Sequence, residues 1–222
     1  MKIPLSGRLL ACCDFVTPGD RVADIGCDHG YLGIYLLSKG IASEVIASDI
    51  NEGPLQSAVR NSEKFGVRDK VRFYLSDGVR NIPREFDTMV CAGMGGDTMV
   101  SILSAAPWLQ SAQYRLILQC QSKTPLLRKY LSETGWRIAK EKVLKDGKFL
   151  YTIMEVLWQP DQPKLTPAQC YISPALIESE EAVAYRKWVI EGLRIATAHT
   201  DDAEKKQILQ ELEIATSPYS RQ

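Results

Sequence analysis

VADIGCDHGYLGIYLL, residues 22–37, is the stretch that decides the fold of this chain. An apolar run typical of a strand ends at Gly26, and a pattern typical of a helix begins after Gly30. Glycine lets the backbone adopt positive φ angles and approach a ligand closely. The N-terminus of the helix directs free N–H groups and the positive end of its dipole toward the same turn. The stretch therefore predicts a strand, a tight turn and a helix that bind a nucleotide-like ligand.

Two acidic residues narrow the class of ligand. Asp28 stands where the dinucleotide motif Gly-x-Gly-x-x-Gly has its second glycine, and its carboxylate would repel a pyrophosphate. This position disfavours a dinucleotide-dependent oxidoreductase. Asp24, just before the turn, suits a ligand that carries an amine or another cation. S-adenosylmethionine has an amino group and a sulfonium and fits this description, whereas the alternative is a plain strand–helix turn of another α/β fold.

Acidic residues also follow the next two predicted strands. Asp49 ends the strand expected at 44–48, and Asp77 and Gly78 follow the strand expected at 71–75. In a doubly wound sheet, the end of the second strand lies beside the ligand crevice. There Asp49 can accept hydrogen bonds from two ribose hydroxyls, and Asp77 from the amino group of adenine, with Gly78 leaving room for the ring. Each acid alone is more often a helix cap or a turn residue.

The remainder of the first domain predicts two more parallel strands and a closing antiparallel hairpin with an Asp-Gly turn. Such a hairpin after five parallel strands is typical of the Rossmann-like α/β sheet of class I methyltransferases. Gly93–Gly96, after the fourth strand, is a candidate floor for the reaction site, or else a turn that lets a helix pack closely. The elements expected here are strands at 86–92, 114–120, 136–144 and 149–158, a helix capped by Asp97-Thr98, and a helix at 126–134.

Both ends of the chain carry helical patterns. A helix is expected at 6–16 with Ser6 as its N-cap. The proline-rich segment 159–174 is predicted to be a linker, and two helices joined by a short turn follow it. They predict a coiled-coil-like hairpin whose apolar stripe serves packing, or alternatively a substrate arm or a dimer contact. The predicted domains are 1–159, which binds S-adenosylmethionine, and 160–222, which is helical.

Composition limits the class of protein. The 222 residues are 45% hydrophobic and 24% charged, as in ordinary globular proteins, and no apolar window is long enough to span a membrane. The six cysteines lack Cys-x-x-Cys spacing and histidine partners, which predicts a reduced, cytoplasmic protein without a metal. The net charge is zero, but residues 161–222 carry 7 Lys+Arg against 10 Asp+Glu, so residues 1–160 carry a net +3. Nucleic-acid binding would therefore need a local basic face.

The chain combines five short motifs: PLSGRL (4–9), ADIGCDHGYL (23–32), DGV (77–79), AGMGG (92–96) and LILQ (116–119). Together with the helical C-terminus they resemble the bacterial tRNA (adenine-22-N1)-methyltransferase family. The resemblance implies transfer of a methyl group from S-adenosylmethionine to N1 of an adenine in the D-arm of tRNA. Two positions depart from the family. Asp49 replaces a usual glutamate and keeps a carboxylate for the ribose, and Cys120-Gln121 replaces a usual Pro-Asn with a longer amide beside the expected target base.

The implied reaction asks little of the side chains, because the N1 lone pair attacks the methyl group directly. Alignment of the reactants, and negative charge near the product cation, are therefore expected to matter most. His29 has an alternative role as a turn residue that bonds the backbone, and Arg8 as a solvated surface residue. The candidates are Asp28, His29 and Gln121 for catalysis; Asp24, Gly26, Cys27, Gly30, Asp49, Ile50, Asp77, Gly78, Gly93 and Met94 for the cofactor; and Arg8, Gly95, Gly96 and Lys123 for the substrate.

Two alternative functions stay open on the sequence alone. A methyltransferase that acts on a small molecule or a protein would share this cofactor site, and so would a non-catalytic protein that binds S-adenosylmethionine. The partner expected from the resemblance is tRNA, with no membrane and no metal. The oligomeric state is open, with a monomer favoured.

Overall fold

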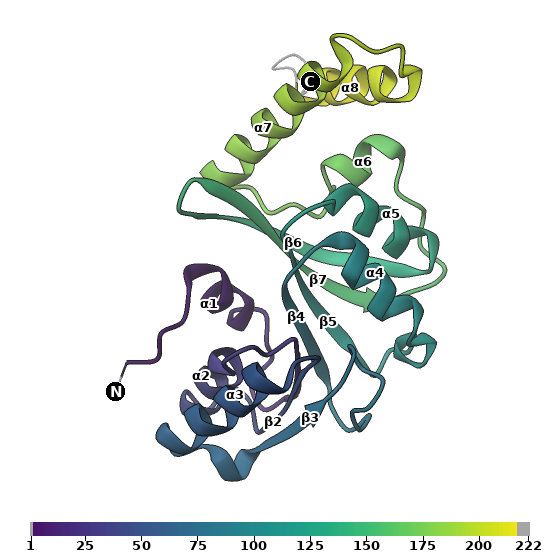
Figure 1. Ribbon diagram of the computed structural model, residues 1–222. Coiled ribbons are helices and arrows are strands. Elements are labelled where there is room, and N and C mark those ends of the chain that lie inside the picture. The colour runs from purple at the N-terminus through teal and green to yellow at the C-terminus, as the bar shows by residue number, and fades with distance from the viewer. Residues whose placement is uncertain (1, 217–222) are drawn as a thin grey trace.

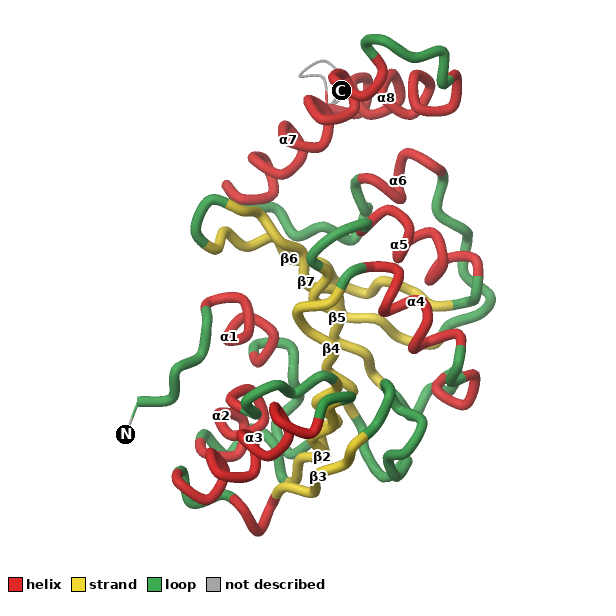
Figure 2. Tube along the Cα trace, viewed as in Figure 1, coloured by secondary structure: helices red, strands yellow, loops and turns green. Residues whose placement is uncertain are grey.

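A mixed seven-stranded sheet forms the centre of the computed structural model, which describes residues 2–216 (Figures 1 and 2). Its strand order is β3-β2-β1-β4-β5-β7-β6. The first five strands are parallel, and β7 is antiparallel to both of its neighbours. The predicted parallel sheet with a closing hairpin is therefore confirmed. The strands are β1 (Arg21–Ile25), β2 (Glu44–Asp49), β3 (Val71–Leu75), β4 (Thr88–Met94), β5 (Arg115–Cys120), β6 (Trp136–Asp146) and β7 (Phe149–Trp158).

The strand order defines where a ligand can bind. From β1 the chain moves outward through β2 and β3, and it then returns to the other side of β1 as β4. The winding direction thus reverses between β1 and β4. Ligands of open α/β sheets bind outside the carboxyl ends of the strands at such a switch point. The turn that begins at Gly26 leaves β1 at this point.

Helices cover both faces of the sheet. Helices α1, α2 and α3 lie on one face, and α4 and α5 lie on the other (Figure 1). Along β5, Leu116 and Leu118 belong to one core and Ile117 to the other, because side chains alternate along a strand. The helices are α1 (Gly7–Cys13), α2 (Tyr31–Ser38), α3 (Glu52–Lys64), α4 (Gly96–Ser104), α5 (Thr124–Glu133), α6 (Pro167–Tyr171), α7 (Glu180–Thr197) and α8 (Ala203–Thr216), with 3₁₀ turns at Arg68–Lys70 and Pro107–Leu109.

The end of β4 differs from the sequence prediction. The sequence predicts a turn at Gly93–Gly96, but β4 continues through Met94. Helix α4 likewise begins before the predicted cap at Asp97-Thr98. The reason is pairing with β5, because the buried Gln119 side chain accepts a hydrogen bond from the Gly93 N–H group at 3.0 Å beside a β-bulge. Gly93 therefore extends the strand, whereas Gly95 and Gly96 begin α4.

The proline-rich segment 159–174, which is predicted to be a linker, is partly helical. It contains α6, where Thr166 and Gln169 form reciprocal capping hydrogen bonds. Buried Arg128 of α5 donates to the carbonyl groups of Cys170-Tyr171 at 2.9 and 2.7 Å. These contacts tie the segment to the first domain, because a buried guanidinium needs acceptors for its N–H groups. The domain boundary at 159/160 stays a prediction.

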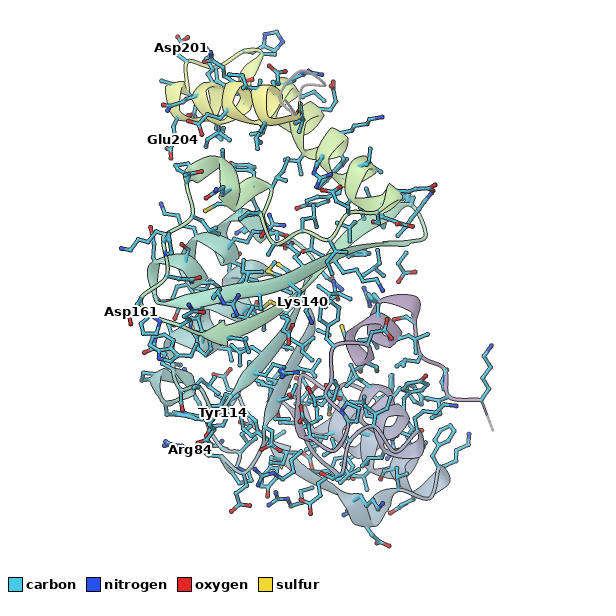
Figure 3. All side chains as sticks on the ribbon, turned by 180° about the vertical axis from the view of Figure 1, so that it is seen from behind. Arg84, Tyr114, Lys140, Asp161, Asp201 and Glu204 are labelled. Atoms are coloured by element: carbon cyan, nitrogen blue, oxygen red, sulfur yellow. The ribbon has the colours of Figure 1, made fainter. Side chains whose placement is uncertain are left out.

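The two C-terminal helices form the predicted hairpin above β6 and β7 (Figure 1). Helices α7 and α8 share an apolar core, and Arg194 pairs with Glu213 across the hairpin at 2.7 Å. Figure 3 shows the molecule from behind, with Asp201 and Glu204 at this end and Tyr114 toward the opposite end. Within the described part of the chain, every helix is too short or too polar to cross a membrane.

Candidate functional site

A cavity of about 420 Å³ opens at the carboxyl ends of β1, β2 and β4, at the switch point of the sheet. Its volume lies in the range of small-ligand sites. Most of the candidate residues from the sequence line it, although they come from separate parts of the chain. They are Arg8, Asp24, Gly26, Cys27, Asp28, His29, Asp49, Ile50, Asp77, Gly78, Gly93, Met94 and Gln121.

The turn after β1 is bent tightly against β2. The N–H groups of Gly26 and Cys27 both donate to the Ser48 carbonyl at 2.8 Å. Gly26 has a φ of +71°, and a Cβ atom there would overlap the Met94 Cε atom. Asp28 has a φ of +51°, which is uncommon for a residue with a side chain. Because residue 26 is glycine, the backbone itself forms the wall of the cavity.

Asp24 is a buried acid beside the cavity. Its Oδ2 atom has no hydrogen-bond partner among residues 2–216. Burial raises the pKa of this carboxyl from 3.8 to about 7, the Gly33 backbone N–H lowers it, and the charge of Asp49 adds to the rise. A buried carboxylate oxygen without a partner costs free energy. Asp24 therefore fits a ligand that brings N–H donors and positive charge.

Asp49 is held in place at the end of β2. Its Oδ1 atom accepts a hydrogen bond from the Asn51 N–H at 2.9 Å, and its Oδ2 atom accepts one from the Asp28 N–H at 3.1 Å. A carboxylate oxygen accepts more than one hydrogen bond, so both can still receive hydroxyl donors. The neighbouring Ile50 is 62% exposed and gives the cavity an apolar wall. The pair suits a sugar joined to a flat, apolar ring.

The loop after β3 places Asp77 at the cavity. Asp77 pairs with Arg80 at 2.8 Å, and both side chains are more than half exposed. Ser76 closes the loop, because its Oγ atom accepts from the Asn81 N–H and donates to the Gly78 carbonyl, both at 3.0 Å. A Cβ atom at Gly78 would lie 2.9 Å from a side chain of α4. Glycine at this position therefore lets α4 approach the loop, and its role in leaving room for a ligand stays a prediction.

Three polar candidates line the cavity from separate elements. The Arg8 guanidinium carbon lies 5.8 Å from the centre of the Tyr151 ring, and its buried Nε atom has no partner within the described chain. His29 Nε2 lies 3.7 Å from Asp28 Oδ1, with both side chains more than half exposed. Gln121 reaches the cavity from the loop after β5. The structure brings them to one cavity, and their individual roles stay predictions.

Four candidates lie outside the lining of this cavity. A Cβ atom at Gly30 would lie 2.8 Å from the Ala58 Cβ atom, so this glycine lets α2 approach α3. A Cβ atom at Gly96 would lie 2.6 Å from the Lys123 carbonyl oxygen, and Lys123 Nζ pairs with Asp97 at 2.6 Å. The glycine contacts are packing contacts and the Lys123 contact is an ion pair, and the ligand roles expected of the four residues stay predictions. The four are Gly30, Gly95, Gly96 and Lys123.

Sequence reasoning missed several residues of the cavity. Most of them adjoin a predicted residue in the chain, as Asn51 and Ser76 do, so adjacency to a strand end is a usable signal. Thr98 and Ile102 gave no such signal, because α4 reaches the cavity only through tertiary packing. The missed residues are Leu9, Ile25, Tyr31, Leu32, Asn51, Ser76, Ala92, Thr98 and Ile102.

Within residues 2–216, the cavity adjoins no cluster of metal-ligating side chains, and its one cysteine is buried. Residues 2–216 contain no group of three or more His, Cys, Asp or Glu side chains that could hold a metal ion. All six cysteines are buried and free, and burial raises the pKa of the Cys27 thiol. A thiol with a raised pKa is a weak nucleophile at neutral pH. The polar side chains that line the cavity are carboxylates, an imidazole, a guanidinium, two amides and three hydroxyls besides the thiol of Cys27.

Comparison with known proteins gives consistent matches. A family model described as "Methyltransferase domain" matches residues 5–154. The tRNA (adenine(22)-N(1))-methyltransferase of Bacillus subtilis is 30% identical over 95% of this chain and 93% of that protein.

Two solved structures agree with these matches. The B. subtilis m1A22 tRNA methyltransferase has 26% identity and a TM-score of 0.78, with 96% of each chain covered. A Streptococcus pneumoniae protein solved in complex with S-adenosyl-L-methionine has 30% identity and a TM-score of 0.82, covering 94% of this chain and 99% of that chain. The chain therefore belongs to the methyltransferase-domain family and, within it, to the family of tRNA (adenine(22)-N(1))-methyltransferases.

Proposed function

We propose that this protein transfers the methyl group of S-adenosylmethionine to N1 of the adenine at position 22, in the D-arm of tRNA. The observation that carries the proposal is the buried Asp24 Oδ2 atom, unpartnered within residues 2–216, beside the cavity at the switch point. The B. subtilis relative, whose name gives this activity, aligns over 95% of the chain.

The cavity residues fit S-adenosylmethionine. Asp24 would hold its amino group, and Asp49 would accept hydrogen bonds from its ribose hydroxyls. Ile50 and the Asp77 loop would enclose its adenine ring. When bound, this cofactor supplies a methyl group activated by a sulfonium. The S. pneumoniae relative that was solved with the same cofactor supports this assignment.

The chain's own residues would mainly orient the target base and stabilise charge. Adenine N1 carries a lone pair, so no side chain has to remove a proton before attack. The methylated base is a cation, and the Asp28 carboxylate beside the cavity provides negative charge that stabilises it. The Gln121 amide can both donate to and accept from a base edge. His29 pairs with Asp28 at 3.7 Å and would fix its direction.

The direct test is incubation with labelled S-adenosylmethionine and unmodified tRNA, followed by nucleoside analysis. The expected product is 1-methyladenosine at position 22, and none from tRNA with guanosine at that position. Label in proteins or metabolites instead would identify a different methyl acceptor. Cofactor binding without any methylated product would identify a non-catalytic binding protein. Either result overturns the proposal.

Three further assignments belong to this proposal. The partner is tRNA, and the compartment is the cytoplasm, which suits six free cysteines. We assign the methyltransferase role to residues 1–159 and a helical, tRNA-facing role to residues 160–222. We also propose that the protein acts as a monomer, which measurement of the molar mass in solution tests.

A further inference from the structure

A second cavity lies next to the first, between the sheet and the C-terminal helices. Its volume is about 370 Å³. One wall is the loop from Cys120 to Pro125, another is the start of β7, and the third is α7. Gln121 lines both cavities. The Arg8–Tyr151 contact, at 5.8 Å, also joins them, because Arg8 lines the first cavity and Tyr151 the second. The second cavity therefore adjoins the proposed reaction site.

The second cavity is aromatic, and its charged residues are basic. Trp188 is 64% exposed and lies 5.9 Å from the buried Tyr185 ring, so one tryptophan face is free for a ligand. Lys123 and Lys205 stand at its edge, each paired with an acid that is not part of the lining. Every charged residue among those that line it is a lysine. Flat rings with attached phosphates match this combination.

A buried polar atom in the same cavity lacks a partner. The Thr152 Oγ1 atom is buried, and no described residue hydrogen-bonds to it. A buried hydroxyl without a partner costs free energy. Since Thr152 lines the second cavity, a polar edge of a ligand there would satisfy it. The residue thus points to a ligand that is apolar on its faces and polar on its edge.

We propose that the second cavity binds an unstacked nucleobase of the tRNA, from a nucleotide next to the target adenine. The inference rests on the proposed function, which places the target adenine in the first cavity. The base stacks on Trp188, its edge reaches Thr152, and Lys123 and Lys205 attract the adjoining phosphates. Helix α7 thereby becomes part of the substrate site, and the loop from Cys120 to Pro125 separates two neighbouring bases.

Gly192 offers a way to fill this cavity without harming the fold. It lines the cavity from α7, and a Cβ atom there would meet open space among the described residues. Leucine is a better helix former than glycine, so Gly192→Leu keeps the helix while its side chain occupies the cavity. Ala184→Leu, on an exposed face of the same helix and outside the cavity, is the matched control.

The test combines these variants with tRNA that lacks one base beside the target adenine. For wild type, removal of the bound base raises the KM for tRNA by about tenfold, the loss expected for one stacked base. For Gly192→Leu the KM is already raised about tenfold, and removal of the base changes it less than twofold. Ala184→Leu behaves as wild type, and all three proteins bind S-adenosylmethionine equally.

Two outcomes would count against these ideas, and they are distinguishable. Removal of the base and the Gly192→Leu substitution could raise the KM independently, so that their effects multiply, or Gly192→Leu could leave the KM unchanged. In either case the second cavity does not hold that base. If wild type forms no 1-methyladenosine on intact tRNA, the proposed function fails. Direct tRNA binding by the same combinations then decides the role of the cavity.

Discussion

The cofactor end and the C-terminal end of this protein are attached to the sheet by different kinds of contact. At the cofactor end, backbone hydrogen bonds hold the turn against the sheet, since the N–H groups of Gly26 and Cys27 both donate to the Ser48 carbonyl. At the C-terminal end, one side chain dominates. Arg128 is fully buried, pairs with Glu141, and also contacts the carbonyls at the end of α6 and the Tyr185 hydroxyl of α7. Backbone hydrogen bonds between a turn and the neighbouring strand therefore shape the first end, and one buried side-chain network shapes the second.

The largest effect should come from Arg128. Arg128→Ala leaves the buried Glu141 carboxylate without its partner, which costs about 3–5 kcal/mol of the free energy of unfolding. Urea unfolding followed by circular dichroism measures this loss. Arg194→Ala, which breaks an exposed pair of the C-terminal hairpin, is the control and should change little. Equal losses in the two variants would mean that the Arg128 network is not the dominant attachment of the C-terminal end.

The next largest effect should be the pH dependence of stability that Asp24 causes. Because its pKa rises from 3.8 to about 7 on folding, the folded protein binds a proton that the unfolded chain releases between these values. Stability from this group is therefore present below about pH 4 and is lost as the pH rises through 7. Asp24→Asn removes this loss, so at pH 8 it should exceed wild type by up to about 4 kcal/mol.

Asp24→Asn should increase stability at high pH and at the same time weaken cofactor binding. The ionised Asp24 carboxylate attracts the cationic cofactor, so wild-type affinity for S-adenosylmethionine should rise as the pH increases through about 7. Asp24→Asn should bind weakly at every pH, as calorimetric titration would show. A variant that binds as wild type does would place the amino group of the cofactor elsewhere.

Substitution of Gly26 tests whether the backbone conformation of the turn after β1 is required for a stable cofactor end. Gly26→Ala combines a positive φ angle with overlap of its Cβ atom and Met94, and should cost about 2–4 kcal/mol of stability. Gly40→Ala, with a φ of +66° and open space around the Cβ atom, isolates the effect of the φ angle at about 1 kcal/mol. Thermal unfolding compares them. A Gly26 variant no worse than Gly40→Ala would show that the turn can widen.

Asp49 should give the smallest of these effects, measured as a loss of cofactor affinity. Asp49→Ala removes a charged acceptor and should weaken binding of S-adenosylmethionine by roughly 1.5–3 kcal/mol. Its two backbone hydrogen bonds are also lost, so Asp49→Asn, which can keep one acceptor, is the matched variant. Calorimetry should rank wild type, Asp49→Asn and Asp49→Ala in falling affinity. Unchanged affinity in folded Asp49→Ala would remove this residue from the cofactor site.

The predictions from the sequence that succeeded concern features formed by residues close together in the chain. The strand at β3 matches its expected bounds of 71–75, and α1 begins after the expected cap Ser6. These signals are local, because a cap or a strand pattern involves residues a few positions apart. The expected turn at Gly93–Gly96 was wrong in extent, because a side chain of β5 bonds Gly93 and prolongs β4. Such a contact joins residues 26 positions apart and leaves no local pattern.

The sequence by itself determined the class of sheet, the turn after β1 and the acids at three strand ends, because each depends on periodicity and on glycine close by in the chain. Tertiary structure decided the rest. In the folded protein the predicted linker is hydrogen-bonded to Arg128, and Gly30 and Gly96 lie in tight packing contacts. The second cavity forms where β7 and α7 meet. Burial and long-range packing, unlike turns and caps, are properties of elements that meet only after folding, so no single stretch of sequence reveals them.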